Sequence, residues 1–263
     1  MIARLALRML ALGYLALLLA FPVSMVFVRT FEGGLGTVWE AVARPAALHA
    51  LWLTVLVAVI AVAANTIFGV ICAIVLVRHE FRGKALLNAL LDLPLAVSPV
   101  VVGLALLIVY GRTSLVGDWL TELGIRVVFS TPGIVLATIF VSLPFVVREV
   151  VPVLREIGTE QEQAASTLGA SAFQTFRLVT LPAIRSGVAY GVVLTTARAI
   201  GEFGAVSIIS GRLAGRTETL TIYVEDRFQS FDLVGCYSAS VILALIAITT
   251  LLLTNLSKPR EEY

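Results

Sequence analysis

Two oppositely charged residues lie four positions apart in a mostly apolar stretch of the sequence. Arg198 and Glu202 stand near the middle of residues 186–211. A spacing of four places both on one face of a helix, and a charge at the centre of a membrane costs about 2.5–3.5 kcal/mol. We therefore expect the pair to face a bundle interior or a wet cavity. Either Arg198 attracts an anion in transit, with Glu202 cancelling part of the attraction, or the pair is structural and fixes helix packing.

Four glycines in the same stretch indicate close helix packing or a hinge. Gly187 and Gly191 have the small-xxx-small spacing that lets membrane helices approach closely. Gly201 and Gly204 leave the middle of the stretch with little side-chain bulk, beside the two charges. The sequence leaves both interpretations open.

Three prolines interrupt two other apolar stretches. Pro94 and Pro99 lie in one and Pro144 in the next, and each removes a backbone hydrogen bond. Helices broken at membrane depth usually border a cavity, where freed helix amides could bind an oxyanion. The sequence does not show which helix ends do so.

Catalytic and metal chemistry are not indicated by the sequence. It contains no G-x-x-x-x-G-K-[ST] phosphate loop, which excludes ATP binding by that route, and no catalytic triad is visible. Cys72 and Cys236 are interpreted as packing thiols, and His49 and His79 as polar flanks of apolar stretches. We expect no catalytic residue, no metal site and no cofactor bound by this chain.

The elements that must position these residues are membrane spans. Of the 263 residues, 59% are apolar and only 14% are charged, against about 45–50% and about 25% in soluble domains. The net charge of +2, with no basic run, gives no indication of nucleic-acid binding.

A span needs about 20 mostly apolar residues. We predict an all-α protein with a single domain over residues 1–263. Its six spans are expected at residues 9–28, 50–77, 93–111, 132–151, 186–211 and 234–256. The first apolar run exceeds the about 7–15 residues typical of a signal peptide, so we interpret it as a span.

Lys and Arg residues in the connections predict the orientation. With the N-terminus inside, eleven fall on the cytoplasmic side and seven on the outer side, and the positive-inside rule then places both termini in the cytoplasm. The eleven are Arg4, Arg8, Arg78, Arg82, Lys84, Arg148, Arg155, Arg177, Arg185, Lys258 and Arg260. The seven are Arg29, Arg44, Arg112, Arg126, Arg212, Arg216 and Arg227.

The long cytoplasmic connection, residues 158–182, has the signals of two short helices. Thr159 followed by Glu162 predicts a capping box at the start of the first helix. Gly169 is expected to end it, because glycine adopts the left-handed conformation at little cost.

The second helix of this connection has an apolar stripe. Ser171 followed by Gln174 predicts another capping box, and Pro182 is expected to end the helix. The stripe consists of Phe173, Phe176 and Val179. It either fills a groove on a partner protein or packs beneath the chain's own bundle, and the spacing alone does not decide between them.

The connection resembles the EAA loop of binding-protein-dependent ABC importer permeases. It has Gln163-Ala164-Ala165, three residues, Gly169, nine residues and Val179-Thr180-Leu181-Pro182, where the family has Glu-Ala-Ala and Ile-x-Leu-Pro at the same spacing. The departure is Gln163 in place of Glu. The resemblance implies a coupling helix that docks on a separate ATPase subunit. The implied coupling residues are Glu162, Gln163, Ala164, Ala165, Gly169, Phe173, Phe176, Leu181 and Pro182.

From about Leu51 onward the chain resembles the sulfate/thiosulfate group of these permeases, of the CysW type. The similar segments are residues 93–103, 144–154, 197–204 and 218–220. Molybdate/tungstate permeases share residues 201–205, so these do not settle the anion.

This resemblance implies a type I importer fold with six transmembrane helices in a bacterial cytoplasmic membrane. It implies a second permease subunit in a heterodimer, two ATPase subunits that bind ATP and Mg, and an extracytoplasmic sulfate-binding protein. The candidate translocation path then includes Arg198, Gly201, Glu202 and Gly204.

Two other classes of protein are alternatives to an ABC importer permease. A secondary anion transporter would need no ATPase, and the intact coupling-loop pattern argues against it. A membrane-embedded enzyme would need a catalytic constellation, and none is visible in the sequence.

Overall fold

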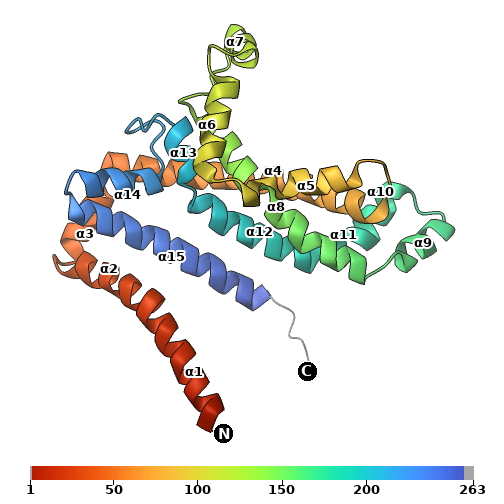
Figure 1. Cartoon of the computed structure of the whole chain (residues 1–263), viewed down its shortest axis with the longest axis horizontal. Coiled ribbons are helices and arrows are strands. Elements are labelled where there is room, and N and C mark those ends of the chain that lie inside the picture. The colour runs from red at the N-terminus through yellow and green to blue at the C-terminus, as the bar shows by residue number, and fades with distance from the viewer. Residues whose placement is uncertain (1, 258–263) are drawn as a thin grey trace.

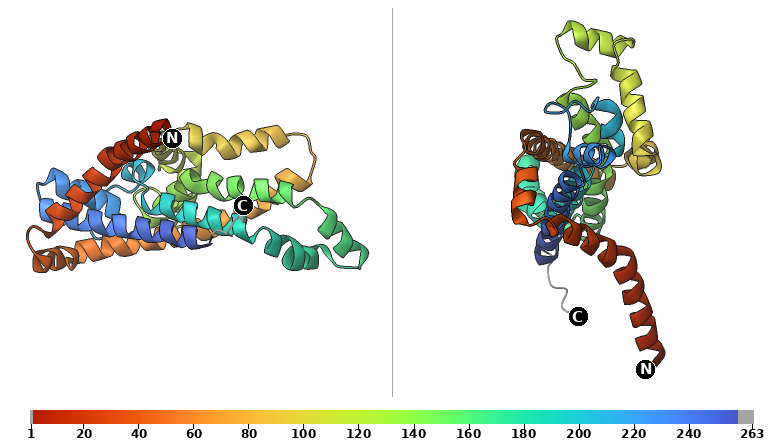
Figure 2. Two further views of the ribbon diagram at one scale, coloured as in Figure 1. Left: turned by 90° about the horizontal axis from the view of Figure 1, so that it is seen from below. Right: turned by 90° about the vertical axis from the view of Figure 1, so that its left-hand side faces the viewer.

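The computed structural model describes residues 2–257, and the regular elements within them are all helices (Figure 1). Four helices form the body: α4 (Pro45–Arg78), α8 (Thr131–Glu156), α12 (Arg185–Ile200) and α15 (Leu233–Ser257). They run along the long axis of the molecule (Figures 1 and 2). We call the end at which α4 and α8 finish the loop end, and the opposite end the far end. The all-α prediction is confirmed for the described residues.

The body helices pack closely at glycines. A Cβ on Gly69 of α4 would lie 2.8 Å from the Cβ of Val146 on α8, and one on Gly191 of α12 would lie 2.9 Å from the Cα of Val146. A Cβ on Gly187 would lie 2.9 Å from the carbonyl oxygen of Glu149. Close packing at Gly187 and Gly191 is therefore confirmed.

An apolar core fills the loop-end half of the body, where α4, α8 and the start of α12 meet. Its buried members are Val70, Cys72, Ala73, Leu76, Leu91, Val146, Val147, Val150, Val151, Leu154 and Ile184. This core gives the loop end a rigid base, because a close-packed interior transmits displacement rather than absorbing it.

An N-terminal arm projects from the body. It consists of α1 (Ile2–Leu15), a π-helical turn (Ala16–Ala20) and α2 (Phe21–Phe31), and α3 (Leu35–Val42) joins it to α4. α1 points away from the body in Figure 1, whereas α2 packs against α15. The apolar window within Ala6–Phe31 buries none of its residues. The arm includes the span expected at residues 9–28.

Four described helices are long and apolar enough to cross a membrane, and the number rises to six if each of two bent pairs counts as one span. In the first pair α5 (Lys84–Ala96) meets α6 (Pro99–Tyr110) at 111°. The bend lies inside the span expected at residues 93–111, where Pro94 and Pro99 predicted a break. The second pair joins Ala172–Ala183 to α12 at 70°.

Residues 186–211, which we expected as one span, form two helices. α12 ends at Ile200, and the chain resumes helical structure as α13 (Gly204–Ile209). Gly201 follows the last helical residue, so the glycines at 201 and 204 flank a break rather than a thinned helix.

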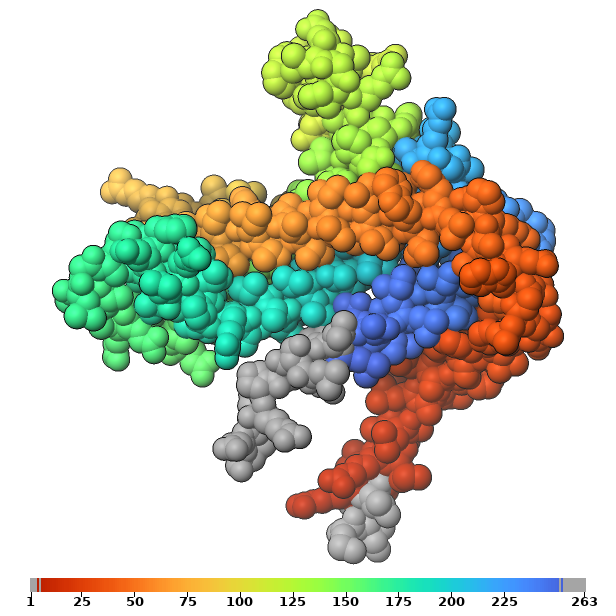
Figure 3. Space-filling model, turned by 180° about the vertical axis from the view of Figure 1, so that it is seen from behind, coloured from red at the N-terminus to blue at the C-terminus, as the bar shows by residue number. Residues whose placement is uncertain are grey.

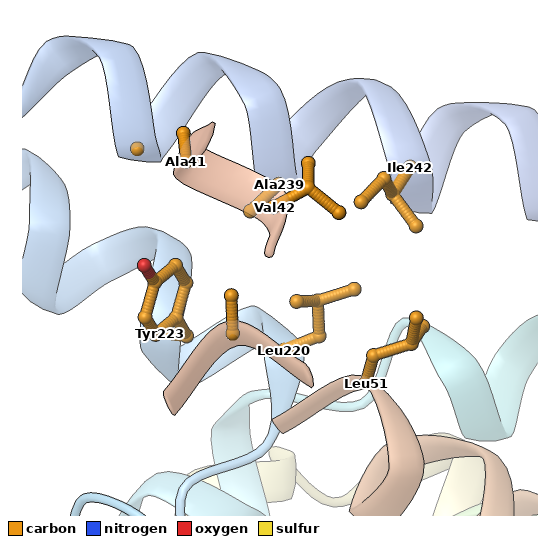
Figure 4. Close-up of a pocket in the computed structure, with 9 residues that line it drawn as sticks. Ala41, Val42, Leu51, Leu220, Tyr223, Ala239 and Ile242 are labelled. Carbon is orange, nitrogen blue, oxygen red and sulfur yellow. The ribbon is translucent and has the colours of Figure 1, made fainter. Parts of the chain in front are cut away.

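The far end is built from short elements. α6 and α7 (Leu115–Glu122) project from the middle of the body, across its long axis (Figure 1), whereas α14 (Leu220–Gln229) packs against α4 and α15 at the far end. Side chains from α3, α4, α14 and α15 converge there, as Figure 4 shows for Ala41, Leu51, Tyr223 and Ile242.

The loop end carries a lobe, residues 158–183, that extends beyond the body helices. It contains α9 (Glu160–Thr167), α10 (Ala172–Thr175), a π-helical turn (Phe176–Thr180) and α11 (Leu181–Ala183). Figure 3 shows it as a rounded mass at the opposite end of the body from the arm's attachment. The second helical stretch ends at Ala183, one residue past Pro182.

Candidate functional site

Glu162 fastens the lobe to the body. Its carboxylate lies 2.9 Å from Nε of Arg78 at the end of α4, and Oε1 accepts a hydrogen bond of 2.8 Å from the hydroxyl of Thr180. Arg78 also donates to the carbonyl oxygens of Leu154 at 3.0 Å and Gly158 at 2.7 Å. One guanidinium thus joins α4, the end of α8 and both halves of the lobe.

The capping box predicted at Thr159 and Glu162 is wrong. Thr159 precedes α9 without a side-chain cap, and its hydroxyl instead accepts a hydrogen bond from Nε2 of Gln163 at 3.0 Å. The Glu162 carboxylate turns to Arg78 because an ionic partner attracts it more strongly than a backbone amide. Gln163, which replaces the family's Glu, is exposed.

The turn between the two lobe helices forms as expected. Gly169 has φ +84° and ends α9, and the amide of Ala170 bonds to the carbonyl oxygen of Ala165 at 3.0 Å. The second capping box is confirmed: Ser171 Oγ accepts from the amide of Gln174 at 3.3 Å, and the Gln174 side chain accepts from the amide of Ser171 at 2.8 Å.

The apolar stripe of the second lobe helix divides between two surroundings. Phe176 is half-buried and packs against the core of the body, whereas Phe173 remains 69% exposed. A π-helical turn occupies Phe176–Thr180, and Leu178 within it is exposed. The sequence did not predict this turn or the exposure of Leu178.

Part of the exposed surface of the lobe is apolar. Leu168 is 89% exposed and Leu178 is 70% exposed, and Ala164, Leu181 and Pro182 also lie at the surface. Beside them an open hollow of about 350 Å³ lies between α4 and the lobe. The hollow is lined by Ile74, Arg78, His79, Glu162, Ser166, Ala170, Ala172, Thr175, Phe176 and Thr180.

The second candidate site lies at the break between α12 and α13. Nη1 of Arg198 lies 2.6 Å from Oε2 of Glu202, and the side chains are 29% and 2% exposed. Glu202 lies beyond the end of α12, so the pair closes across the helix terminus rather than along a helix face.

Glu202 also holds the segment that follows. Its Oε1 accepts a hydrogen bond from the amide of Ala205 at 2.8 Å, which caps α13, and its carbonyl oxygen accepts one from Thr221 at 2.9 Å. Glu202 therefore has a structural role, as one of our two interpretations expected, while Arg198 keeps an exposed side.

The break lies against the bend between α5 and α6. A Cβ on Gly204 would lie 2.9 Å from the Cβ of Pro99, and a Cβ on Gly103 would lie 2.6 Å from the carbonyl oxygen of Ala205. Ser98 and Gly201, one from each interruption, are exposed. Two interrupted helices thus meet at one depth, and non-helical backbone at that depth is tolerated only in contact with protein or water.

Comparison with known proteins identifies similar sequences. Residues 65–261 match the family described as binding-protein-dependent transport system inner membrane component. The sulfate transport system permease protein CysW of Synechocystis sp. is 48% identical over 97% of this chain and 92% of its own length. The Escherichia coli CysW protein is 49% identical over 94% of this chain and 85% of its own length. The Escherichia coli permease CysT is 39% identical over 89% of this chain and 85% of its own length.

Solved structures with the same fold also exist. A bacterial ABC transporter involved in the import of the acidic polysaccharide alginate contains a chain with a TM-score of 0.80 and 14% identity, covering 99% of this chain and 96% of that one. A bacterial alginate ABC transporter in complex with a pentasaccharide-bound periplasmic protein gives a TM-score of 0.74 at 18% identity, covering 96% of this chain and 92% of that one. At these identities the likeness establishes the fold.

Proposed function

The chain belongs to the family of binding-protein-dependent transport system inner membrane components, and we propose that it is the permease subunit of an ATP-driven importer for sulfate or thiosulfate. Identity of 46–49% to several permeases named for sulfate transport, over more than nine-tenths of the chain, is the observation that carries the choice of substrate. The fold and the lobe agree with it.

The lobe is the surface through which ATP hydrolysis is coupled to transport. Its exposed apolar side chains, with Phe173 and Leu178 at the centre, fit a groove on an ATPase subunit. Arg78 and Glu162 hold the lobe firmly to α4 and α8, so a displacement of the lobe moves the body helices. In this proposal the chain itself is not catalytic, and ATP and Mg are bound by the partner ATPase.

The translocation path passes the place where the break between α12 and α13 meets the bend between α5 and α6, which we call the double break. Arg198 presents part of its guanidinium beside the exposed backbone at Gly201, and an oxyanion there would meet a cation that is only partly neutralised. Transient contact suits transport, because a path residue has to release the ion as well as attract it.

The assembly contains a second permease, two ATPase subunits and an extracytoplasmic binding protein. The similarity to both CysW and CysT supports a heterodimer, and one similar solved transporter is in complex with a periplasmic protein. The exposed arm, α1 and α2, provides a surface for the second permease or for lipid.

The chain resides in a bacterial cytoplasmic membrane with both termini in the cytoplasm. The excess of Lys and Arg in the connections on the lobe side supports this orientation. Lys258 and Arg260, which belong to that excess, lie outside the described residues.

Uptake of labelled sulfate by vesicles that carry the whole complex tests the proposal. We expect ATP-dependent uptake that thiosulfate inhibits and that molybdate inhibits weakly. Molybdate as the preferred anion would support the alternative, a molybdate/tungstate permease. Uptake that persists without ATP or an ATPase subunit would support a secondary anion transporter instead.

A further inference from the structure

A second ion pair joins α5 to α8 toward the loop end of the body. Nε of Arg148 on α8 donates a hydrogen bond of 2.7 Å to Oδ1 of Asp92 on α5, and Nη2 of Arg148 contacts the other carboxylate oxygen. The carboxylate therefore occupies the two-pronged face of the guanidinium. The side chains remain 43% and 35% exposed.

The pair borders the apolar core of the loop end, and Arg148 lies inside the span expected at residues 132–151. Its sequence neighbours, Leu91 and Val147, are buried in the loop-end core together with Val70 and Leu76 of α4. A charge that faces lipid at this depth is costly, so charged membrane residues usually face a partner or a water-filled cavity. The exposed side of Arg148 is therefore expected to face one of these.

The position of the pair relates it to the double break. Asp92 and the bend at Ser98 lie on the same segment, six residues apart, which is about 9 Å along a helix. Pro99, directly after the bend, touches Gly204 beside the Arg198 site. Since α5 begins at the loop end, Arg148 lies between the Arg198 site and the lobe side of the protein.

We propose that Arg148 is a second anion-contact residue of the translocation path, which receives the oxyanion after Arg198, and that Asp92 is the counter-ion that holds its guanidinium between transport events. The inference rests on the proposed function. A tetrahedral oxyanion offers the guanidinium the same pair of oxygens that Asp92 offers. A partly exposed ion pair contributes little to stability, so the anion can displace the carboxylate at small cost.

Variants of the pair test the proposal in proteoliposomes that contain the whole complex. R148Q is expected to lower labelled-sulfate uptake at least tenfold, while ATP hydrolysis stays within twofold of wild type. D92N keeps the arginine and is expected to retain at least half of the uptake. R148K keeps the charge but loses the two-pronged face, and we expect uptake to fall several-fold.

The exchange R148D/D92R separates transport from structure. A purely structural pair would be restored by the exchange, whereas an anion contact on α8 would not, so we expect uptake as low as in R148Q. Wild-type uptake in the exchanged variant would overturn the proposal, as would wild-type uptake in R148Q. If R148Q does not assemble, wild-type uptake by R148K would overturn it instead.

A control separates this inference from the proposed function. If the wild-type complex takes up another oxyanion and no sulfate, the proposed substrate is wrong. The same four variants are then measured with that anion, and the same outcomes decide the role of Arg148.

Discussion

Glu162 is the carboxylate on which the attachment of the lobe depends. Arg78 is only 11% exposed and Glu162 21% exposed, so E162A would leave a largely buried guanidinium without its ionic partner. Such a loss costs about 1–3 kcal/mol. We expect a lower melting temperature for the purified complex in detergent and reduced sulfate uptake per ATP hydrolysed.

Glu160 provides the matched control on the same helix, because its side chain is exposed. E160A should melt and transport as the wild type does. Equal melting temperatures for E162A and E160A would show that the ion pair does not fasten the lobe.

Glu218 makes stability depend on pH at the far end. Its side chain is 1% exposed, and burial, aided by the negative charge of Asp226, raises its pKa from 4.5 to about 7. The folded state thus holds the proton more tightly than the unfolded state does. The resulting stability is fully present below about pH 4.5 and is lost as the pH rises through about 7.

E218Q replaces the acid by a neutral group of the same shape. At pH above 8 we expect it to unfold at a higher temperature than wild type, with a gain of up to about 3 kcal/mol, and to flatten the pH dependence between about 5 and 8. Thermal unfolding across that range measures the effect. E122Q, at an exposed carboxyl on α7, should leave the profile unchanged, and a profile of E218Q that follows wild type would contradict the assignment.

Sequence patterns correctly predicted the turns and caps that depend only on neighbouring residues. Gly169 and the Ser171–Gln174 box formed as expected, because each depends on residues within one turn. Thr159 and Glu162 fitted the same pattern and did not form it, since the preferred partner of Glu162, Arg78, is 84 positions away. No spacing rule in a single sequence contains such a partner.

The breaks were predicted in part. Pro94 and Pro99 indicated the interruption between α5 and α6, because proline removes a hydrogen bond wherever it lies. The end of α12 at Ile200 was missed, since glycine permits a break without requiring one. The exposed ion pair of Arg148 was also missed, because its carboxylate lies on another helix.

Close approach of α12 and α8 makes Gly191 sensitive to the addition of a single carbon. A Cβ there would lie 2.9 Å from the backbone of Val146, which cannot move aside as a flexible side chain can. We expect G191A to destabilise the permease by about 1–3 kcal/mol. G36A in α3, where a Cβ would meet nothing within 4 Å, should be neutral or slightly stabilising. Melting temperatures in detergent measure both variants, and a melting temperature of G191A equal to that of G36A would contradict the prediction.

As a whole, the chain exposes apolar surface in two different settings. Most of the arm, α1 and α2, is apolar and exposed, but lipid is an adequate solvent for it. The lobe extends past the ends of the body helices (Figure 3), and its exposed Leu168, Phe173 and Leu178 would there be in contact with water. Exposed apolar patches of that kind mark protein interfaces, so we expect a protein partner to cover the lobe, whereas lipid can cover the arm.

Two phenylalanines three residues apart separate folding from docking. Phe176 packs on the core of the body, so F176S should lower the stability of the permease by about 2–4 kcal/mol. Phe173 is 69% exposed, so F173S should leave the melting temperature unchanged and weaken capture of the ATPase subunit at least tenfold. Size-exclusion chromatography of the detergent-solubilised complex, with thermal unfolding of the permease alone, measures both effects. Full ATPase capture by F173S would show that the partner binds another part of the lobe.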